Sequence, residues 1–535
     1  MKINKLYLFA VILLTVALLV VACGPTDEAP TGEAPEGEEP EAVEGSSGDL
    51  IIATLSDAVA LDPHGSNDVP SSNVAYNIYE SLVVFDRNSE LQPLLAADWE
   101  AIDDLTWQFT LREGVKFHDG SELNAEVVKA NFDRLLDPDI ASPRFFLFSM
   151  IEEIVVVDDY TVQFVTGSPF APLPAHLAHS GGALVSLPAI EADYAEMAAG
   201  NEPGSYISQN PNGTGLFKLD YWEPGSEIKL VRNDDYWGEP AKLDSVTFKV
   251  VPEDLTRLSE LETGYAHIAD PIQPSDASRV ENMDNAYLNV QSSTSLAYIG
   301  FNCDKAPYDD VRVRQAVSMA INKDDIIDGI YEGTAIPAVG PIAPGVFGYD
   351  PSVSAIPYDV DRAQELLAEA GYADGFDTII WTNDNPARIK IAEYVQSRLS
   401  EININVSIEV LEWGAYLDGT AEGGHEMFIL GWSTPTLDAD YAMYALFHSS
   451  NVGEPGNRSF FRNDEVDELL DLGRQESDPD LRAQYYREAQ ELLVEQAPML
   501  YLLHIEDLTG VNSSVQNFYL TPARIFILKD VYIEE

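Results

Sequence analysis

The sequence has very little cysteine and few positively charged residues. Cys23 and Cys303 are the two cysteines among 535 residues, and 30 Lys and Arg stand against 90 Asp and Glu, for a net charge of -60. This negative charge makes nucleic acid an implausible partner, because phosphate backbones are repelled. If Cys23 is modified, one thiol remains, so no intramolecular disulfide can form and stability must come from the core.

Catalytic signatures are also missing. The sequence contains no GxSxG, HExxH or CxxC motif and no phosphate-binding P-loop, which are the usual local signs of an enzyme. We therefore predict that the protein is not an enzyme, has no catalytic residues and uses no cofactor. His176 and His179 have a spacing that suits a metal, but no third ligand is evident, so no metal site is predicted.

Long apolar runs are confined to the N-terminus. Lys2 and Lys5 precede an apolar run from Leu6 to Val21 and then Ala22-Cys23, which is typical of an export signal with a lipobox. The run is shorter than the roughly 20 residues of a membrane span. We predict a lipoprotein signal peptide at 1-22, and lipidation of Cys23 at the start of an acidic disordered tether at 23-49. The protein would be exported and anchored by its acyl chains to the outer face of the cytoplasmic membrane, in the periplasm or at the cell surface.

The first half of the remaining chain favours antiparallel strands. Trp107, Phe109 and Leu111 alternate with polar residues before a turn at Asp119-Gly120, which predicts a half-buried hairpin strand. Asn124 is a predicted N-cap of the helix that follows. Further strands are predicted at residues 160–165, 216–221, 227–232 and 245–251.

The second half has a different pattern. "FDTIIW", a helical stripe over 389–399 and "INVSIEVLEW" predict a strand–helix–strand unit, and hence a parallel pair of strands. Near the C-terminus, Asp478-Pro479 begin a predicted helix, and "MLYLLH" a buried strand. The buried stripe of that helix is predicted to be Leu481, Tyr485, Ala489 and Leu492.

Three tryptophans share one place in this topology. Trp381, Trp413 and Trp432 each lie at or just past the carboxyl end of a predicted strand. In open α/β sheets, ligands bind in the crevice outside those ends. The alternative that a Trp caps the sheet core stays open for each of them. His425 comes too early in its strand to reach the crevice, and we predict that it lies on a solvated face.

Two carboxylates follow Trp432 in "GWSTPTLDADYAMYALFHSS". Asp438 and Asp440 could form a carboxylate pair for acid–base chemistry. A turn, a helix cap or a ligand contact is favoured over catalysis for both residues, because an extended segment would aim them the same way and a turn would separate them.

Several stretches resemble one protein family. The most specific is "NPNGTGLFKLDYWEPGSEIKLVRNDDYWGEPAKLDSVTFKVVPE", and "LTWQFTLREGVKFHDGSELNAEVVKANFDRL", "GFNCDKAPYDDVRVRQAVSMAINKDDII" and "YDVDRAQELLAEAGY" occur in the family's order. They are similar to the extracellular solute-binding proteins of peptide/nickel ABC importers, family 5, which include dipeptide-, oligopeptide- and glutathione-binding proteins. The resemblance covers essentially everything after the tether.

The resemblance implies an α/β fold: a two-lobed periplasmic-binding-protein clamshell (type II, cluster C) with an extra subdomain in the first lobe. The expected boundaries are a lobe I core from 50-85, 206-295 and 507-535, an extra subdomain at 86-205, and lobe II at 296-506. A ligand is held between the lobes, and binding shifts the population toward the closed form.

The family's binding residues transfer only in part. Peptide-binding members have an Asp three places after the residue that matches Trp432, where it pairs with the peptide's amino terminus, and this sequence has Pro435 there. Asp438 and Asp440 match the family's later D-x-D. Arg144 is similar in position to a ligand-facing Arg of nickel-chelate-binding relatives, although an ion pair with an acid is its equal alternative. The predicted ligand-binding residues are Arg144, Trp381, Asn383, Arg388, Trp413, Tyr416, Trp432, Ser433, Asp438, Asp440 and Tyr441.

The resulting prediction is a lipid-anchored, monomeric substrate-binding protein of an ABC importer. It would capture a peptide or peptide-like solute, such as an oligopeptide, dipeptide or glutathione, and deliver it to the permease and ATPase subunits in the membrane. A nickel chelate, an opine or an oligosaccharide is the alternative on the same scaffold. Alternatives of other classes are a secreted hydrolase that uses Asp438 or Asp440, and a receptor or chaperone for exposed protein segments.

Overall fold

The computed structural model describes residues 48–534 except 67, 384, 412 and 454–455. The predicted signal peptide, Cys23 and nearly all of the tether therefore lie outside the described residues. Within the described part, no helix combines the length and apolar character that crossing a membrane requires. Two cis peptide bonds precede Pro271 and Pro307.

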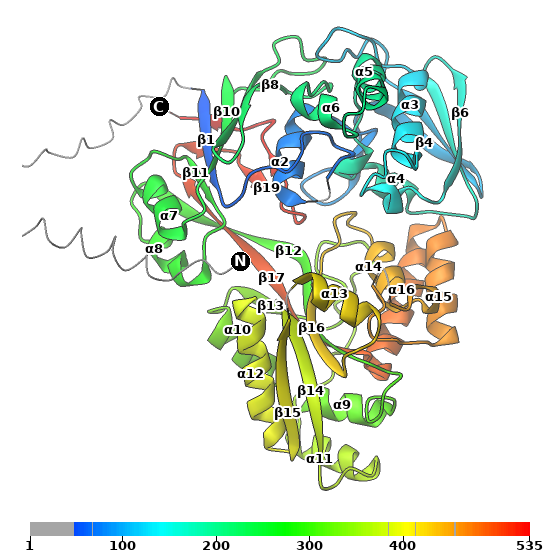
Figure 1. Cartoon of the computed structure of the whole chain (residues 1–535), viewed down its shortest axis with the longest axis vertical. Coiled ribbons are helices and arrows are strands. Elements are labelled where there is room, and N and C mark those ends of the chain that lie inside the picture. Colours follow the sequence, from blue (N-terminus) through cyan, green and yellow to red (C-terminus); the bar gives the residue numbers. More distant parts are fainter. Residues whose placement is uncertain (1–47, 67, 384, 412, 454–455, 535) are drawn as a thin grey trace, which may run out of the picture. The chain divides into compact units, whose positions relative to one another are not determined.

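One large mixed sheet runs through both halves of the described structure (Figure 1). Its strand order is β15-β14-β16-β12-β17-β11-β1-β10-β9-β8, and β13 pairs with β17 beside this path. The strands are β1 (Asp49–Thr54), β8 (Phe217–Glu223), β9 (Glu227–Arg232), β10 (Ser245–Val250), β11 (Ile268–Asp270), β12 (Ala286–Phe301), β13 (Ala335–Pro337), β14 (Phe376–Asn383), β15 (Ile404–Leu411), β16 (Met427–Trp432) and β17 (Met499–Asn512).

Two long strands, β12 and β17, connect the halves. They pair antiparallel, with Leu288 opposite Gly510 in the first half and Ile299 opposite Leu500 in the second. Their ladder is interrupted between Ser292 and Leu296, so residues 293–295 are free of regular strand pairing, as in a bulge. In Figure 1 this pair passes from the upper to the lower half.

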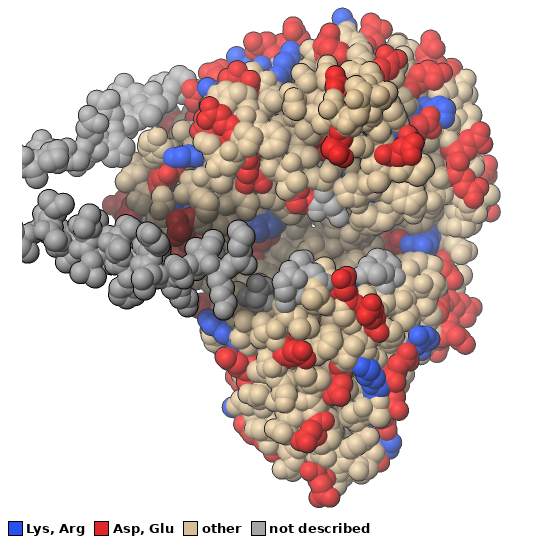
Figure 2. Space-filling view, viewed as in Figure 1, with Lys and Arg blue, Asp and Glu red and all other residues tan. Residues whose placement is uncertain are grey.

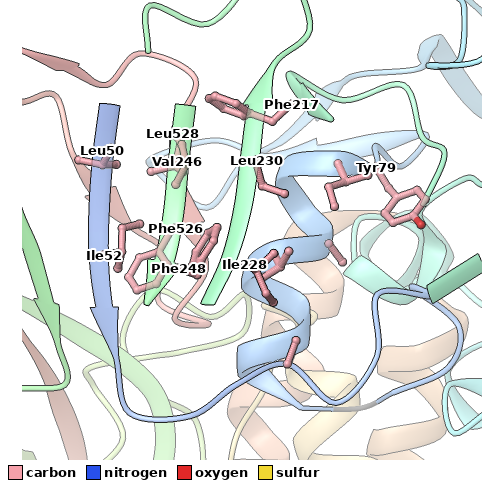
Figure 3. Packing of buried hydrophobic residues seen from close by; sticks show 14 of the residues in the cluster. Leu50, Ile52, Tyr79, Phe217, Ile228, Leu230, Val246, Phe248, Phe526 and Leu528 are labelled. Carbon is pink, nitrogen blue, oxygen red and sulfur yellow. The ribbon is translucent and has the colours of Figure 1, made fainter. Parts of the chain in front are cut away.

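The first half buries the inner face of its part of the sheet against α2 (Val69–Ile78). Leu50 and Ile52 of β1, and Val246 of β10, have no exposed surface, as period-2 alternation requires of residues on one face. Figure 3 shows these side chains in one buried cluster beside α2, and this cluster also contains Phe526 of the C-terminal segment. That segment contains β18 (Val515–Gln516), β19 (Tyr519–Leu520), β20 (Phe526–Ile527) and β21 (Tyr532–Ile533). Helices α5 (Leu187–Ala198), α6 (Ser205–Gln209), α7 (Asp254–Glu262) and α8 (Ala277–Glu281) complete this half.

A separate antiparallel sheet, β4-β5-β7-β6, forms its own core with α3 (Ala125–Leu136). The predicted strands here are confirmed: β5 spans Thr106–Leu111 and β7 spans Thr161–Thr166. Asn124 is the N-cap of α3, and its side chain accepts a hydrogen bond from the Val127 amide. The other elements are β2 (Val83–Phe85), β3 (Leu91–Pro93), β4 (Ala96–Asp103), β6 (Ile151–Asp158) and α4 (Leu173–Leu177).

The predicted strand–helix–strand unit in the second half is confirmed. β14, α12 (Pro386–Ser400) and β15 follow one another, and the two strands pair parallel, with Phe376 opposite Ile404. β16 adds to β14 in the same direction, so the carboxyl ends of β14 and β16 lie at one edge of the sheet. The helices around them are α9 (Val311–Met319), α10 (Lys323–Ile330), α11 (Val360–Glu369), α13 (Trp413–Ala421), α14 (Ala439–Phe447), α15 (Asp464–Gln475) and α16 (Pro479–Gln496).

The predicted start of α16 is confirmed, and so is the burial of Ala489, but the other three residues of its predicted buried stripe are not buried. Asp478 caps the helix, yet Leu481 is 43% exposed while Arg482, Tyr486, Ala489 and Leu493 are buried. The apolar pattern misled because the inward position is occupied by an arginine. Arg482 can be buried there since Asp438 neutralises it, which a count of apolar residues cannot reveal.

Candidate functional site

A cavity of about 340 Å³ lies between the two halves of the described structure. The first half supplies α2 and the segment around Arg144, and the second half supplies the end of β16 and the loop that follows it. Concave sites of this volume, lined by both apolar groups and a few polar ones, are typical of small-molecule binding. The lining includes Asp68, Val69, Ser72, Tyr76, Phe85, Arg144, His179, Ser180, Ser293, Thr294, Ser295, Gly431, Trp432, Ser433, Pro435, Leu437, Tyr441, Thr521, Arg524 and Ile525.

The interruption of the β12–β17 ladder provides part of this lining. The Thr294 amide donates to the Pro522 carbonyl at 3.0 Å, and the Ser295 and Ser433 hydroxyls lie 2.7 Å apart. The Thr434 amide donates to the Thr294 hydroxyl at 3.3 Å. Residues 293–295 are therefore held against the end of β16 by side chains rather than by strand pairing.

Arg144 provides a buried positive charge at the cavity. Its side chain donates to the Ser72 hydroxyl at 3.0 Å and to the Ser180 hydroxyl at 3.5 Å, and the residue is only 3% exposed. Burial lowers the pKa of Arg144 to about 10, although Tyr441 and Asp68 counteract it. The guanidinium is still charged at neutral pH, so it favours an anionic group in the cavity.

Aromatic side chains form the wall from the second half. Trp432 is the last residue of β16, and its ring centre lies 5.7 Å from that of Tyr441 on α14. Tyr441 also contacts Phe146 of the first half, at 6.0 Å between ring centres. Of the predicted ligand-binding residues, the structure thus brings together Arg144, Trp432, Ser433 and Tyr441 around one cavity.

Asp438 and Asp440 do not line the cavity, because arginines engage both carboxylates. Asp440 accepts hydrogen bonds from Arg474 at 2.8 and 3.0 Å, and Asp438 accepts two from Arg482 at 2.9 and 2.8 Å. Burial by itself would raise the pKa of Asp440, but Arg474 overcomes this effect and lowers it. Each aspartate is 3% exposed or less, so the structure shows them as parts of the packed interior.

The Asp440–Arg474 pair also reaches the first half. The Arg474 carbonyl accepts a hydrogen bond from the Ala171 amide at 2.8 Å. The Arg474 guanidinium lies 5.2 Å from the ring centre of Phe170 and 3.4 Å from that of Tyr444, within the range of a cation–π interaction. Asp440 therefore orients a residue that bridges the two halves beside the cavity.

The other predicted site residues are not among those that line this cavity. Tyr416 has no exposed surface and donates its hydroxyl to the Ile429 carbonyl at 2.6 Å. Arg388 donates to the Asn383 side chain at 2.9 Å. Trp381 packs so closely on Gly424 that a Cβ added to Gly424 would lie 2.6 Å from the Trp381 ring. This packing agrees with the alternative in which the tryptophan caps the core of the sheet. Trp413 begins α13, and its side chain lies outside the described part of the structure.

His425 was predicted to lie on a solvated face, and the structure corrects this. The residue has no exposed surface, and its ring centre lies 4.6 Å from that of Phe428 and 6.2 Å from that of Phe460. It precedes β16 where the chain turns inward around Gly423, whose φ is 74°. A position early in the strand therefore does not mean that the side chain is exposed. Burial lowers the pKa of His425 to about 3.

This burial predicts a loss of stability on mild acidification. The unfolded chain binds a proton at His425 near pH 6.5, whereas the folded chain does not until about pH 3. The stability contribution is thus fully present above pH 6.5 and is lost as pH falls, by about 2 kcal/mol at pH 5. His425→Phe should reduce the difference in free energy of unfolding between pH 7 and pH 5, measured by urea titration. An unchanged difference would contradict a buried neutral imidazole.

Sequence reasoning missed much of the first-half wall. Asp68 precedes α2 as its N-cap and accepts a hydrogen bond from the Ser71 amide at 2.8 Å; "NDVPSS" carries a capping signal that could have predicted this helix start. The "SSTS" run at 292–295 interrupts an apolar strand pattern and could have marked the break in β12. Nothing local in residues 521–525 points to a cavity.

The acidic side chains of the surface do not gather at one place that would mark a binding site. Figure 2 shows acidic side chains spread over the visible face of both halves, and that face is hollowed between them. A scattered distribution favours a solvated acidic surface over a dedicated site for a cation.

Comparisons with known proteins agree with this geometry. Residues 90–454 match the model of the bacterial extracellular solute-binding proteins, family 5 Middle. A glutathione-binding protein of Salmonella typhi is 34% identical over 493 residues, which cover 90% of this chain and 94% of that protein.

Two examples among the solved structures with the same fold are peptide complexes. One is the periplasmic binding protein DppA of Helicobacter pylori in complex with the peptide STSA, at a TM-score of 0.76 and 32% identity, covering 91% of this chain and 98% of that one. The other is a dipeptide-binding protein of Pseudoalteromonas in complex with Met-Leu, at a TM-score of 0.76 and 26% identity, covering 91% and 100%. The chain therefore has the two-lobed α/β fold of these proteins, belongs to the bacterial extracellular solute-binding proteins of family 5, and binds a solute rather than transforming one.

Proposed function

We propose that this protein captures a peptide or peptide-like solute between its two lobes and delivers it to the permease of an ABC importer. The observation that carries the proposal is the cavity to which both lobes contribute, with the buried guanidinium of Arg144 at one wall and Trp432 at the other. A solute in this position would lose its water shell when the lobes close. It would shift the equilibrium from the open to the closed form only as far as it binds the closed form more tightly. The relatives named for glutathione and peptides support this class of solute.

The charges around the cavity define how such a solute would bind. The carboxylate of the solute would pair with Arg144, because a guanidinium offers a carboxylate two parallel hydrogen-bond donors. Pro435 lines the cavity where peptide-binding members of the family have an acid, so an amine would not be anchored at that point. Asp68 is the acidic residue among the described lining residues, and it is the proposed partner of the amine.

The remaining parts of the proposal concern the ends and the boundaries of the chain. Cys23 carries the lipid that holds the protein at the membrane, and residues 23–49 are the spacer that lets the lobes reach the permease. The lobe boundaries proposed from the sequence are kept, with lobe II at 296-506 between the two crossings of β12 and β17. The protein acts as a monomer, alongside the permease and ATPase subunits.

The test is native mass spectrometry of the purified protein, followed by fragmentation of whatever small molecule is released. We expect a peptide or a glutathione-like thiol peptide, and small-angle X-ray scattering should show compaction when it is added back to ligand-free protein. Release of an oligosaccharide or an opine would contradict the peptide class while leaving solute binding intact. Absence of compaction with every small molecule tested would contradict capture by lobe closure.

A further inference from the structure

A second cavity, of about 280 Å³, opens beside the first and belongs entirely to the first lobe. Tyr76, Phe85 and Ser180 line both cavities, so the two spaces adjoin at these side chains. The rest of the second cavity is formed by the C-terminal end of α2, by β2, by the segment 519–530, and by Leu94, Ala183, Gly215, Leu216 and Tyr236. Because one lobe supplies every wall, the cavity exists before the lobes close.

The walls of this cavity are largely aromatic and aliphatic. Tyr79, Tyr236 and Tyr519 contribute rings, and Leu216 and Leu528 contribute aliphatic surface. A cavity of roughly 150 Å³ lined by apolar side chains is enough to hold benzene. This one therefore has room for a phenyl, phenol or indole ring, whose burial releases much apolar surface from water.

The Glu80 and Asp86 carboxylates in the walls already have partners within the protein. The Glu80 carboxylate accepts hydrogen bonds from the Tyr236 hydroxyl at 2.6 Å, the Trp237 indole at 2.8 Å and the Thr214 hydroxyl at 2.7 Å. Asp86 accepts from the amides of Asn88 and Glu90. A polar ligand group would have to compete with these contacts, whereas an apolar one would not.

We propose that the second cavity is a subsite for one bulky apolar side chain, aromatic or aliphatic, of the solute held in the main cavity. This inference rests on the proposed function, and it defines the solute class more closely. A peptide that carries such a side chain gains affinity from the subsite, and a solute with small side chains, such as glutathione, occupies the main cavity only. Tyr76 and Phe85 form the passage between the two parts of the solute.

The test compares tri-alanine with the three tripeptides that carry one Phe at each position, by titration calorimetry on the full-length protein freed of bound solute. At least one Phe peptide should bind about tenfold or more tightly than tri-alanine, as burial of a phenyl ring predicts. Leu216→Trp fills the second cavity from a half-buried position and should abolish that gain, with tri-alanine binding unchanged within about twofold.

Leu219→Trp is the matched control, because Leu219 packs against the same core from β8 and does not line the cavity. Val84→Trp fills the cavity from β2 and guards against a folding defect specific to residue 216. The proposal is overturned if the Phe gain is absent, if it survives both filling variants, or if these weaken tri-alanine equally. If no tripeptide binds the unaltered protein, the proposed function itself fails, which is a distinct result.

Discussion

Asp438→Ala is expected to lower the free energy of unfolding by about 3–5 kcal/mol, the usual cost of leaving a buried charge without its partner. Asp438 accepts two hydrogen bonds from Arg482 in the interior, and a third from the Asp440 amide at 3.0 Å. Arg482 is further fixed by donating to the Gly473 carbonyl at 2.7 Å, and it lies 4.7 Å from the ring centre of Phe347. Removal of the carboxylate would strand this guanidinium between α14, α15 and α16. Urea denaturation followed by circular dichroism measures the effect.

Asp304→Ala is the matched control, because Asp304 pairs with Arg462 where both side chains are about half exposed, at 51% and 50%. Loss of that pair should cost less than about 1 kcal/mol. The double variant Asp438→Leu with Arg482→Met should recover much of the stability lost in Asp438→Ala, since it leaves no buried charge unpaired. If Asp438→Ala were no more destabilising than Asp304→Ala, the ion pair would not be the reason that Asp438 is buried.

Arg144→Ala is expected to weaken binding of a peptide with a free carboxyl terminus by about a hundredfold. Truncation of one partner in a buried, hydrogen-bonded charge pair costs roughly 2–5 kcal/mol. Arg144→Lys keeps the charge but loses the planar pair of donors, so an intermediate loss is expected. Tri-alanine and its C-terminal amide serve as probes in titration calorimetry. The unaltered protein should prefer the free acid, and Arg144→Ala should bind both forms alike.

Arg232→Ala controls for the loss of a positive charge as such, since Arg232 pairs with Asp234 and Asp244 at the surface and does not line the cavity. It should leave the preference for the free acid intact. If Arg144→Ala weakened the acid and the amide by the same factor, Arg144 would be shaping the cavity through Ser72 and Ser180 rather than pairing with a carboxylate.

Local patterns in the sequence predicted the individual elements well where one residue type decides the conformation. Asn124 and Asp478 mark helix starts because a short polar side chain can accept the first free amides. The strands predicted at 227–232 and 376–381 follow from alternation and from apolar runs, and the structure has β9 and β14 there. Most of the predicted α16 stripe and the predicted exposure of His425 were wrong because the environments come from other elements: Asp438 for the first, and Phe428 and Phe460 for the second.

The sequence by itself determined the class of the protein: the order of strands and helices, the absence of a catalytic motif, and the stretches shared with one family. Only the tertiary structure decided which residues meet. Arg144, Asp68 and Trp432 are far apart in the chain and line one cavity, whereas Asp438 and Asp440, beside Trp432 in sequence, turn away to Arg482 and Arg474. The physical reason is that Asp438 is the N-cap of α14, so its carboxylate and that of Asp440 project toward α15 and α16. The arginines that meet these carboxylates come from distant parts of the chain, Arg474 from α15 and Arg482 from α16, and no local pattern records such pairings.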